Sequence, residues 1–237
     1  MKNTKLITMI EGAIIAGVCI ALSYIPLQTA NAAFDLSLGL IPLGVYALRR
    51  GLLPGLLVGF VWGLLLIVLG KAFILTIPQV LLEYPLAFAF GGFGGIFSGA
   101  LRRRLANSAA TFSGNSFAGG SRGQISDNHF ASEPSAQISD NPFAGGPSRQ
   151  KRSGFSLVIL IVVLSGIVAA VARWFFHYWA GVIFWGSYAP EGMSPYLYSF
   201  IANGASAAAN AAMLAIVLSV LVRTVRTVFM AKDNLRQ

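Results

Sequence analysis

The chain has 237 residues, of which 56% are hydrophobic and 11% are charged, and its mean hydropathy is +0.71. Soluble domains carry about 25% charged residues, so this composition excludes an ordinary water-soluble enzyme or binding domain. The net charge of +9 would suit a nucleic-acid-binding protein. However, the basic residues lie in gaps between apolar segments and form no basic face, so we expect the lipid bilayer, and no nucleic acid, as a partner.

Six apolar segments follow one another along the chain. A membrane span needs about 20 mostly apolar residues, and the predicted spans cover approximately residues 6–26, 36–48, 52–69, 73–101, 154–185 and 194–222. The second is short for a full span, which favours a tilted or partly re-entrant segment. Pro78 and Pro85 interrupt the fourth, and such interruptions tend to shape cavities. The sequence therefore predicts an all-α integral membrane protein with six transmembrane helices.

The distribution of basic residues indicates the orientation of these spans. If six helices alternate in direction, all of the 17 basic residues except Lys71 and Arg173 fall on one side. Loops on the cytoplasmic side of a membrane are enriched in Lys and Arg, so this side is predicted to be cytoplasmic and to hold both termini. The loops at 27–35, near 70–72 and at 186–193 would then face outward.

Residues 105–153 differ in composition from the rest of the chain. They are rich in Ser, Gly, Asn and Ala, and the pentapeptide QISDN occurs twice, at 124–128 and 137–141. Such a composition predicts a disordered cytoplasmic loop, either a passive linker or a segment for partner binding or phosphorylation. The loop divides one membrane domain into residues 1–104, with the first four helices, and residues 154–237, with the last two helices and a cytoplasmic tail.

Polar side chains recur inside the apolar segments, where ionisable groups are costly and usually face a cavity or a partner. They lie in the predicted outer half of the fourth, fifth and sixth spans. A spacing of four residues places four side chains of the fifth span on one helix face. The candidate set comprises Glu83, Arg173, His177, Gly181, Trp185, Tyr198 and Asn203.

The sequence leaves two interpretations of these residues open. Glu83 and Arg173 could simply form an ion pair between two helices, His177 could be a packing histidine, and Trp185 and Tyr198 could be interfacial anchors. Alternatively, the groups converge on one pocket. A carboxylate with several aromatic rings would suit a small, flat, polar and cationic ligand.

The first span carries a face of small residues at four-residue spacing. Gly12, Ala13, Ala16, Gly17 and Ala21 form this face, with four-residue spacing at Ala13, Gly17 and Ala21 and at Gly12 and Ala16. Such faces let another helix approach closely. The partner helix could belong to the same bundle or to another protein.

No catalytic residues, metal site or cofactor are expected. Gly70 and Lys71 look like the end of a P-loop, but Ala72 stands where Ser or Thr is required, so the chain does not hydrolyse ATP by that route. No Ser/His/Asp grouping and no set of residues with metal-ligand spacing is present. A membrane-embedded enzyme that uses Glu83 and His177 as acid and base is the alternative of a different class.

The chain resembles a known family in several stretches outside the 105–153 segment. These include Leu82-Glu83-Tyr84 and, most specifically, residues 173–204, which read RWFFHYWAGVIFWGSYAPEGMSPYLYSFIANG. The family is the thiamine-specific substrate-binding (S) component of energy-coupling factor (ECF) transporters. The resemblance implies a six-helix protein of the bacterial cytoplasmic membrane that binds thiamine from outside with high affinity. It also implies docking on a shared module of one transmembrane scaffold subunit and two ATPases. An S component for another vitamin or for a thiamine precursor is the nearest alternative.

The resemblance further assigns roles to single residues. It implies thiamine contacts from the set Glu83, Tyr84, His177, Trp185, Tyr198 and Asn203, with Arg173 where relatives can have Lys. Ala33 or Phe34 stands where relatives have a tryptophan on the first outer loop, which makes Phe34 a candidate binding residue. The face formed by Ala13 and Gly17 resembles the motif through which these components dock on the scaffold subunit.

Overall fold

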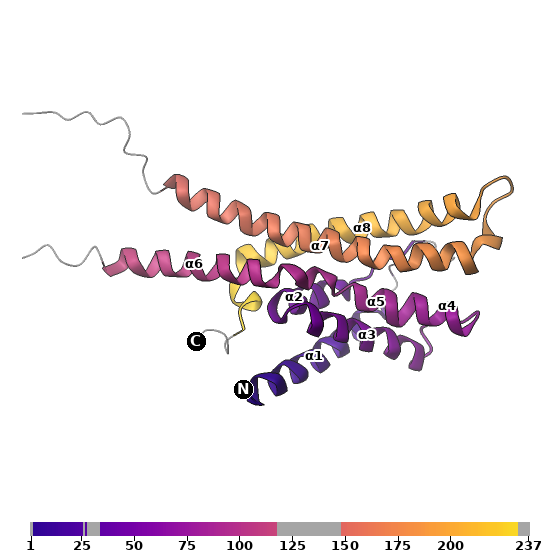
Figure 1. Cartoon of the computed structure of the whole chain (residues 1–237), viewed down its shortest axis with the longest axis horizontal. Coiled ribbons are helices and arrows are strands. Elements are labelled where there is room, and N and C mark those ends of the chain that lie inside the picture. The colour runs from indigo at the N-terminus through magenta and orange to yellow at the C-terminus, as the bar shows by residue number, and fades with distance from the viewer. Residues whose placement is uncertain (1, 26, 28–33, 118–147, 232–237) are drawn as a thin grey trace, which may run out of the picture.

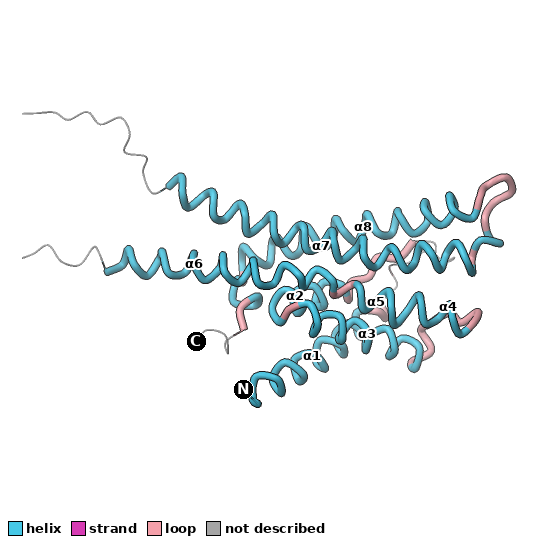
Figure 2. Tube along the Cα trace, viewed as in Figure 1, coloured by secondary structure: helices cyan, strands magenta, loops and turns pink. Residues whose placement is uncertain are grey.

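The computed structural model of the chain describes residues 2–25, 27, 34–117 and 148–231, and these residues form helices and loops without a β-sheet (Figures 1 and 2). Five helical units are single helices: α1 (Lys2–Leu22), α2 (Leu40–Arg50), α3 (Leu52–Val68), α7 (Ser148–Phe184) and α8 (Pro195–Thr224). The longest of them is α7. The remaining helical unit, which is the fourth along the chain, is a composite helix. It consists of α4 (Ile77–Leu81), the π-helical turn η1 (Leu82–Leu86), α5 (Ala87–Phe90), the 3-10 turn η2 (Phe93–Phe97) and α6 (Ser98–Phe117). The predicted all-α bundle of six helical units is therefore confirmed.

Four of the described helical units are long and apolar enough to cross a membrane by themselves. They comprise α1, the composite helix, α7 and α8, whereas α3 is a shorter apolar helix. In Figure 1, α7 and α8 run side by side along the bundle, and the connections from α3 to α4 and from α7 to α8 lie at the same end. The beginning of α1 and the end of α8 lie at the opposite end, as expected for an even number of alternating spans.

Three span limits differ from the sequence-based predictions. The first helix ends at Leu22, before residue 26, and α2 begins at Leu40, after residue 36. The composite helix begins at Ile77 instead of residue 73, because Thr76 caps it: the Thr76 hydroxyl accepts a hydrogen bond from the Gln79 backbone N–H at 3.3 Å.

Helices extend into both ends of the predicted loop at 105–153. The helix α6 continues to Phe117, and α7 already begins at Ser148. Residues 118–147, with both copies of the pentapeptide repeat, lie outside the described residues.

The second predicted span corresponds to α2 and is short, as the sequence indicated. The 11 residues of α2 extend only about 17 Å, against a hydrocarbon thickness of about 30 Å. Residues 34–39 precede α2 as non-helical chain (Figure 2). Non-helical backbone is tolerated at membrane depth only where protein groups satisfy its N–H and C=O groups, and the polar side chains of α8 do this here, as described below.

The helix α3 packs unusually closely behind the segment that carries Glu83 and Tyr84. A Cβ atom added at Gly59 would lie 2.2 Å from the Phe88 carbonyl oxygen, and one added at Gly63 would lie 2.4 Å from the Tyr84 carbonyl oxygen. The π-helical turn lies directly opposite and contains Pro85, which has no N–H to donate to a regular helix. The two glycines therefore fix the position of this turn.

Candidate functional site

A cavity of about 430 Å³ opens between the first loop, α3, η1, α7 and α8. Its volume lies within the usual range of small-molecule sites. Eight of the predicted site residues line it: Glu83, Tyr84, Arg173, His177, Gly181, Trp185, Tyr198 and Asn203. Phe34 is not among the residues that line the cavity, and its contact with a ligand stays a prediction.

Glu83 is held in the cavity wall by two neutral donors. Trp185 donates from Nε1 to Glu83 Oε1 at 2.6 Å, and the side-chain amide of Gln79 donates to the other carboxylate oxygen. Gln79 is fully buried and also donates to the Phe73 carbonyl oxygen at 3.1 Å, so the loop before α4 is tied to the carboxylate. Among the described residues no cation pairs with Glu83, which makes the proposed ion pair with Arg173 wrong.

Aromatic side chains surround this carboxylate. The Phe73 and Trp185 rings lie 5.3 Å apart between centroids, and Tyr188 contacts the other side of Trp185 at 5.5 Å. The Tyr84 hydroxyl accepts a hydrogen bond from the Phe73 backbone N–H at 2.8 Å, and the Tyr84 ring stacks on Phe88. A flat cationic ligand would therefore find ring faces next to a carboxylate.

Arg173 pairs with an acid that the sequence analysis did not consider. Its Nη2 lies 3.2 Å from Oδ2 of Asp35, and its guanidinium carbon lies 4.5 Å above the Phe88 ring. The Arg173 side chain is only 7% exposed, whereas that of Asp35 is 37% exposed. Two signals could have identified Asp35: Arg173 is a lone cation within a span, and Asp35 is an acid in a loop on the same predicted side.

His177 is not the satisfied packing histidine of the simpler interpretation. Its Nε2 is buried without a hydrogen-bond partner among the described residues, and the same holds for Nε1 of Trp174. Both side chains line the cavity. Buried polar atoms are nearly always hydrogen-bonded, so unpaired atoms in a cavity wall are typical of groups that contact a ligand.

The close contact between α7 and α8 depends on Gly181. A Cβ atom at this position would lie 2.2 Å from Ser199 Oγ and 2.8 Å from Asn203 Nδ2. Ser199 donates from this hydroxyl to the Tyr178 carbonyl oxygen at 2.7 Å, and Asn203 donates to Ser199 Oγ at 3.1 Å. Gly181 therefore contributes to the site by allowing the amide of Asn203 to reach the cavity.

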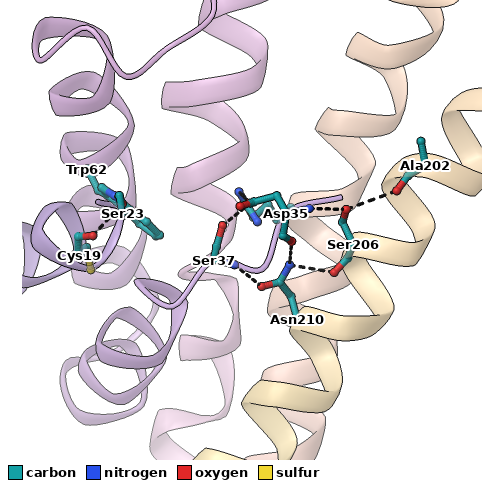
Figure 3. Close-up of polar contacts among 9 residues, drawn as sticks. Cys19, Ser23, Asp35, Ser37, Trp62, Ala202, Ser206 and Asn210 are labelled. Carbon is teal, nitrogen blue, oxygen red and sulfur yellow. Dashed lines mark hydrogen bonds and ion pairs between the residues drawn. The ribbon is translucent and has the colours of Figure 1, made fainter. Parts of the chain in front are cut away.

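The first loop is fastened to α8 through its backbone (Figure 3). Asn210 accepts from the Ser37 backbone N–H at 2.9 Å and donates to the Asp35 carbonyl oxygen at 2.8 Å. Ser206 Oγ accepts from the Asp35 backbone N–H at 3.0 Å. These bonds satisfy backbone groups of the non-helical chain before α2 and place the Asp35 carboxylate beside Arg173. The sequence analysis missed Asn210, although it is an amide within an apolar span.

The small-residue face of α1 points away from the bundle. Ala13, Gly17 and Ala21 are all exposed, and a Cβ atom at Gly17 would meet nothing within 4 Å. By contrast, Gly12 and Ala16 are buried, and a Cβ atom at Gly12 would lie 2.9 Å from Tyr46 Oη. The prediction that these two residues belong to the same face is therefore wrong. The predicted docking residues are therefore available to a partner.

Comparisons with known proteins agree with this architecture. Over 236 residues the chain is 34% identical to thiamine transporter ThiT of Lacticaseibacillus paracasei, covering 98% of this chain and 95% of the relative. It is 23% identical over 225 residues to thiamine transporter ThiT of Bacillus subtilis, covering 94% of each chain. A solved structure of ThiT from Listeria monocytogenes superposes with a TM-score of 0.73 at 34% identity, covering 97% of this chain and all of that one.

The family comparison gives the same result. These relatives are named transporters, so the alternative of a membrane-embedded enzyme is wrong. The model of the thiamine transporter protein family (Thia_YuaJ) matches residues 9–230, nearly the whole chain. The chain thus belongs to this family of multi-pass membrane transporters.

Proposed function

We propose that this chain is the S component of an ECF-type importer and binds thiamine with high affinity from outside. The observation that carries the proposal is the Glu83 carboxylate, which lies in an aromatic cavity and is held only by neutral donors among the described residues. Thiamine joins a flat aminopyrimidine to a cationic thiazolium ring. A carboxylate without a protein cation can accept hydrogen bonds from the amino group or balance the thiazolium charge.

The remaining cavity residues suit the other parts of this ligand. Trp185 and Phe73 offer ring faces for stacking and for contact with a cation. His177 Nε2 and the side chain of Asn203 supply polar atoms along the α7–α8 wall. In this assignment Tyr198 contacts the ligand from α8, and Gly181 keeps Asn203 in place.

The proposed direction of binding rests on the charge distribution. The basic residues gather at the end of the bundle where α1 begins and α8 ends, which would make this end cytoplasmic. The α3–α4 and α7–α8 connections would then face outward. Glu83 and Trp185, which follow or precede these connections closely, would lie in the outer half of the membrane and be reached from outside.

Energy for uptake would come from partner proteins. We propose that a transmembrane scaffold subunit, joined to two ATPases, docks on the exposed face formed by Ala13, Gly17 and Ala21. Small residues on an exposed helix face allow a second helix to approach closely in a membrane. The chain itself lacks the P-loop residues that such a process requires.

Thiamine titration of the detergent-purified protein by isothermal calorimetry tests the binding proposal. Replacing Trp185 with Phe keeps an aromatic ring but removes the donor to Glu83, which should weaken binding by about 1.5–3 kcal/mol. Trp179→Phe is the matched control, because Trp179 is 40% exposed and does not line the cavity. Absence of thiamine binding by the folded wild-type protein would contradict the proposal, and binding of the free aminopyrimidine instead would favour the thiamine-precursor alternative.

Thiamine uptake by cells that also produce the energising subunits tests the docking proposal. Ala13→Leu should abolish most uptake while leaving thiamine binding by the purified protein unchanged. Ala208→Leu is the control, since Ala208 is equally an exposed alanine but lies on α8. Equal uptake by both variants would show that this face of α1 is not the docking surface.

A further inference from the structure

The proposed thiamine site contains a built-in electrostatic conflict. Arg173 and Glu83 line the same cavity of about 430 Å³, so a cationic ligand bound there lies close to a buried protein cation. Arg173 cannot lose its proton in a protein, and its guanidinium is only slightly exposed. A positive group in a cavity of low polarity opposes a cationic ligand more strongly than it would in water.

Asp35 is the described residue that compensates this charge. Its carboxylate contacts Nη2 of Arg173 at 3.2 Å and also the hydroxyl of Ser37. The Phe88 ring lies beneath the guanidinium, and His177 follows one helical turn later along α7. Among the described residues, no second carboxylate pairs with Arg173.

The position of Asp35 does not depend on its own carboxylate. Its backbone N–H donates to Ser206, and its backbone carbonyl accepts from Asn210, so α8 fixes the loop through main-chain atoms (Figure 3). The first loop, held by α8, thus keeps Asp35 in contact with Arg173 of α7, which lies 138 positions away in the sequence. A loop that served only to close the cavity would not need a carboxylate at this point.

We propose that Asp35 is a specificity-determining residue: by neutralising Arg173 it allows the cavity to accept a cationic ligand and to favour it over a neutral one of the same shape. Ser206 and Asn210 act as positioning residues for Asp35. This inference rests on the proposed thiamine function. It distinguishes the role of Asp35 from that of Glu83, which would contact the ligand itself.

The inference predicts an effect that depends on the charge of the ligand. Asp35→Asn keeps the size of the side chain and every main-chain bond of the loop, but leaves the Arg173 charge uncompensated. We expect the affinity for thiamine to fall about tenfold or more. The affinity for deazathiamine, in which a neutral thiophene replaces the thiazolium ring, should change by less than about twofold, because a neutral ring does not interact with a full charge in this way.

Calorimetric titrations of the full-length protein with both ligands test this prediction. Glu191→Gln is the matched control, because it removes an exposed carboxylate of the α7–α8 connection that does not line the cavity. A double-mutant cycle with Arg173→Gln completes the design. Adding Arg173→Gln to Asp35→Asn removes the uncompensated cation, so the double variant should regain the wild-type ratio of the two affinities.

The outcomes separate the inference from the function on which it rests. A selective loss of thiamine affinity in Asp35→Asn that the additional Arg173→Gln substitution reverses supports the role of Asp35. An equal loss for both ligands would show that Asp35 only holds the loop, and no loss for either would show that its charge is unimportant. Both results overturn the inference while leaving the thiamine function intact. Failure of the wild-type protein to bind thiamine would instead overturn the proposed function.

Discussion

The helices α7 and α1 both carry small residues on one face, but the surroundings of these residues are opposite. A Cβ atom at Gly181 of α7 would lie 2.2 Å from Ser199 Oγ, whereas one at Gly17 of α1 would meet nothing within 4 Å. On α7 the small residue lets α7 and α8 of the same chain approach closely where they line the cavity. On α1 it leaves an exposed face. The same sequence pattern therefore serves internal packing in one helix and, in our proposal, docking in the other.

The polar residues beside each face distinguish the two cases. Gly181 has His177 one turn before it and Trp185 one turn after it, and all three line the cavity. The neighbours of Gly17 on its face are exposed and uncharged, and the acid of α1, Glu11, pairs with Arg49 and Arg50 of α2 at 3.1 and 2.6 Å. Small residues beside polar side chains that line a cavity indicate a binding site. Small residues beside exposed, uncharged ones indicate a surface for another helix.

The largest expected effect on folding is at Gly181. Gly181→Ala would force α7 and α8 apart, which should lower the free energy of unfolding by about 1–3 kcal/mol. Thiamine binding should weaken as well, because Asn203 would be displaced from the cavity wall. Thermal unfolding in detergent and calorimetric binding measure the two effects. Gly17→Ala is the control and should leave the free energy of unfolding and the thiamine affinity unchanged. If Gly181→Ala and Gly17→Ala behaved alike, the proposed contrast between the faces of α7 and α1 would be wrong.

An effect of similar size is expected where α8 holds the first loop. Asn210→Ala removes three hydrogen bonds from a fully buried side chain, which should lower the free energy of unfolding by about 1–3 kcal/mol. Ser219→Ala is the matched control on the same helix, because the buried Ser219 hydroxyl has no partner among the described residues. Thermal unfolding of the two variants gives the answer, and unchanged stability of Asn210→Ala would contradict the anchoring role.

The smallest effect is expected within α1 itself. A Cβ atom at Gly12 would lie 2.9 Å from Tyr46 Oη and 3.0 Å from Val58 Cγ2. Gly12→Ala should therefore cost about 1 kcal/mol or less, since side-chain ends can move and alanine favours the helix. Gly17→Ala should be neutral or slightly stabilising. A larger loss for Gly17→Ala than for Gly12→Ala, measured by thermal unfolding, would reverse the assignment of the inner and outer faces of α1.

The sequence could predict the composition of the cavity wall but not all of its contacts. Four-residue spacing on the fifth span predicted that Arg173, His177, Gly181 and Trp185 share a face, and all four line the cavity. The bond from Trp185 to Glu83 joins residues 102 positions apart, and no periodic pattern specifies such a contact. The sequence also left an Arg173–Glu83 ion pair open. In the fold, Arg173 instead pairs with Asp35, and Glu83 accepts hydrogen bonds from Trp185 and Gln79.

The loops were the least predictable part of the fold. The hydropathy pattern located the six helical units, but it extended three of them into non-helical chain, at residues 23–25, 36–39 and 73–76. Asp35 was missed since a single acid in a loop carries no periodic signal. The position of Phe34 outside the cavity wall likewise depends on how Asn210 and Ser206 hold the following residues.

The most direct test of the central claim is the thiamine affinity of Glu83→Gln, measured by isothermal calorimetry beside the wild-type protein and Glu191→Gln. Glu83→Gln preserves the size of the side chain but removes the charge that the cavity holds between Trp185 and Gln79. The loss of a buried charged partner typically costs about 2–5 kcal/mol, so binding should weaken about 30-fold or more, while Glu191→Gln binds as the wild type does. Wild-type affinity in Glu83→Gln would contradict the assignment of this cavity as the thiamine site.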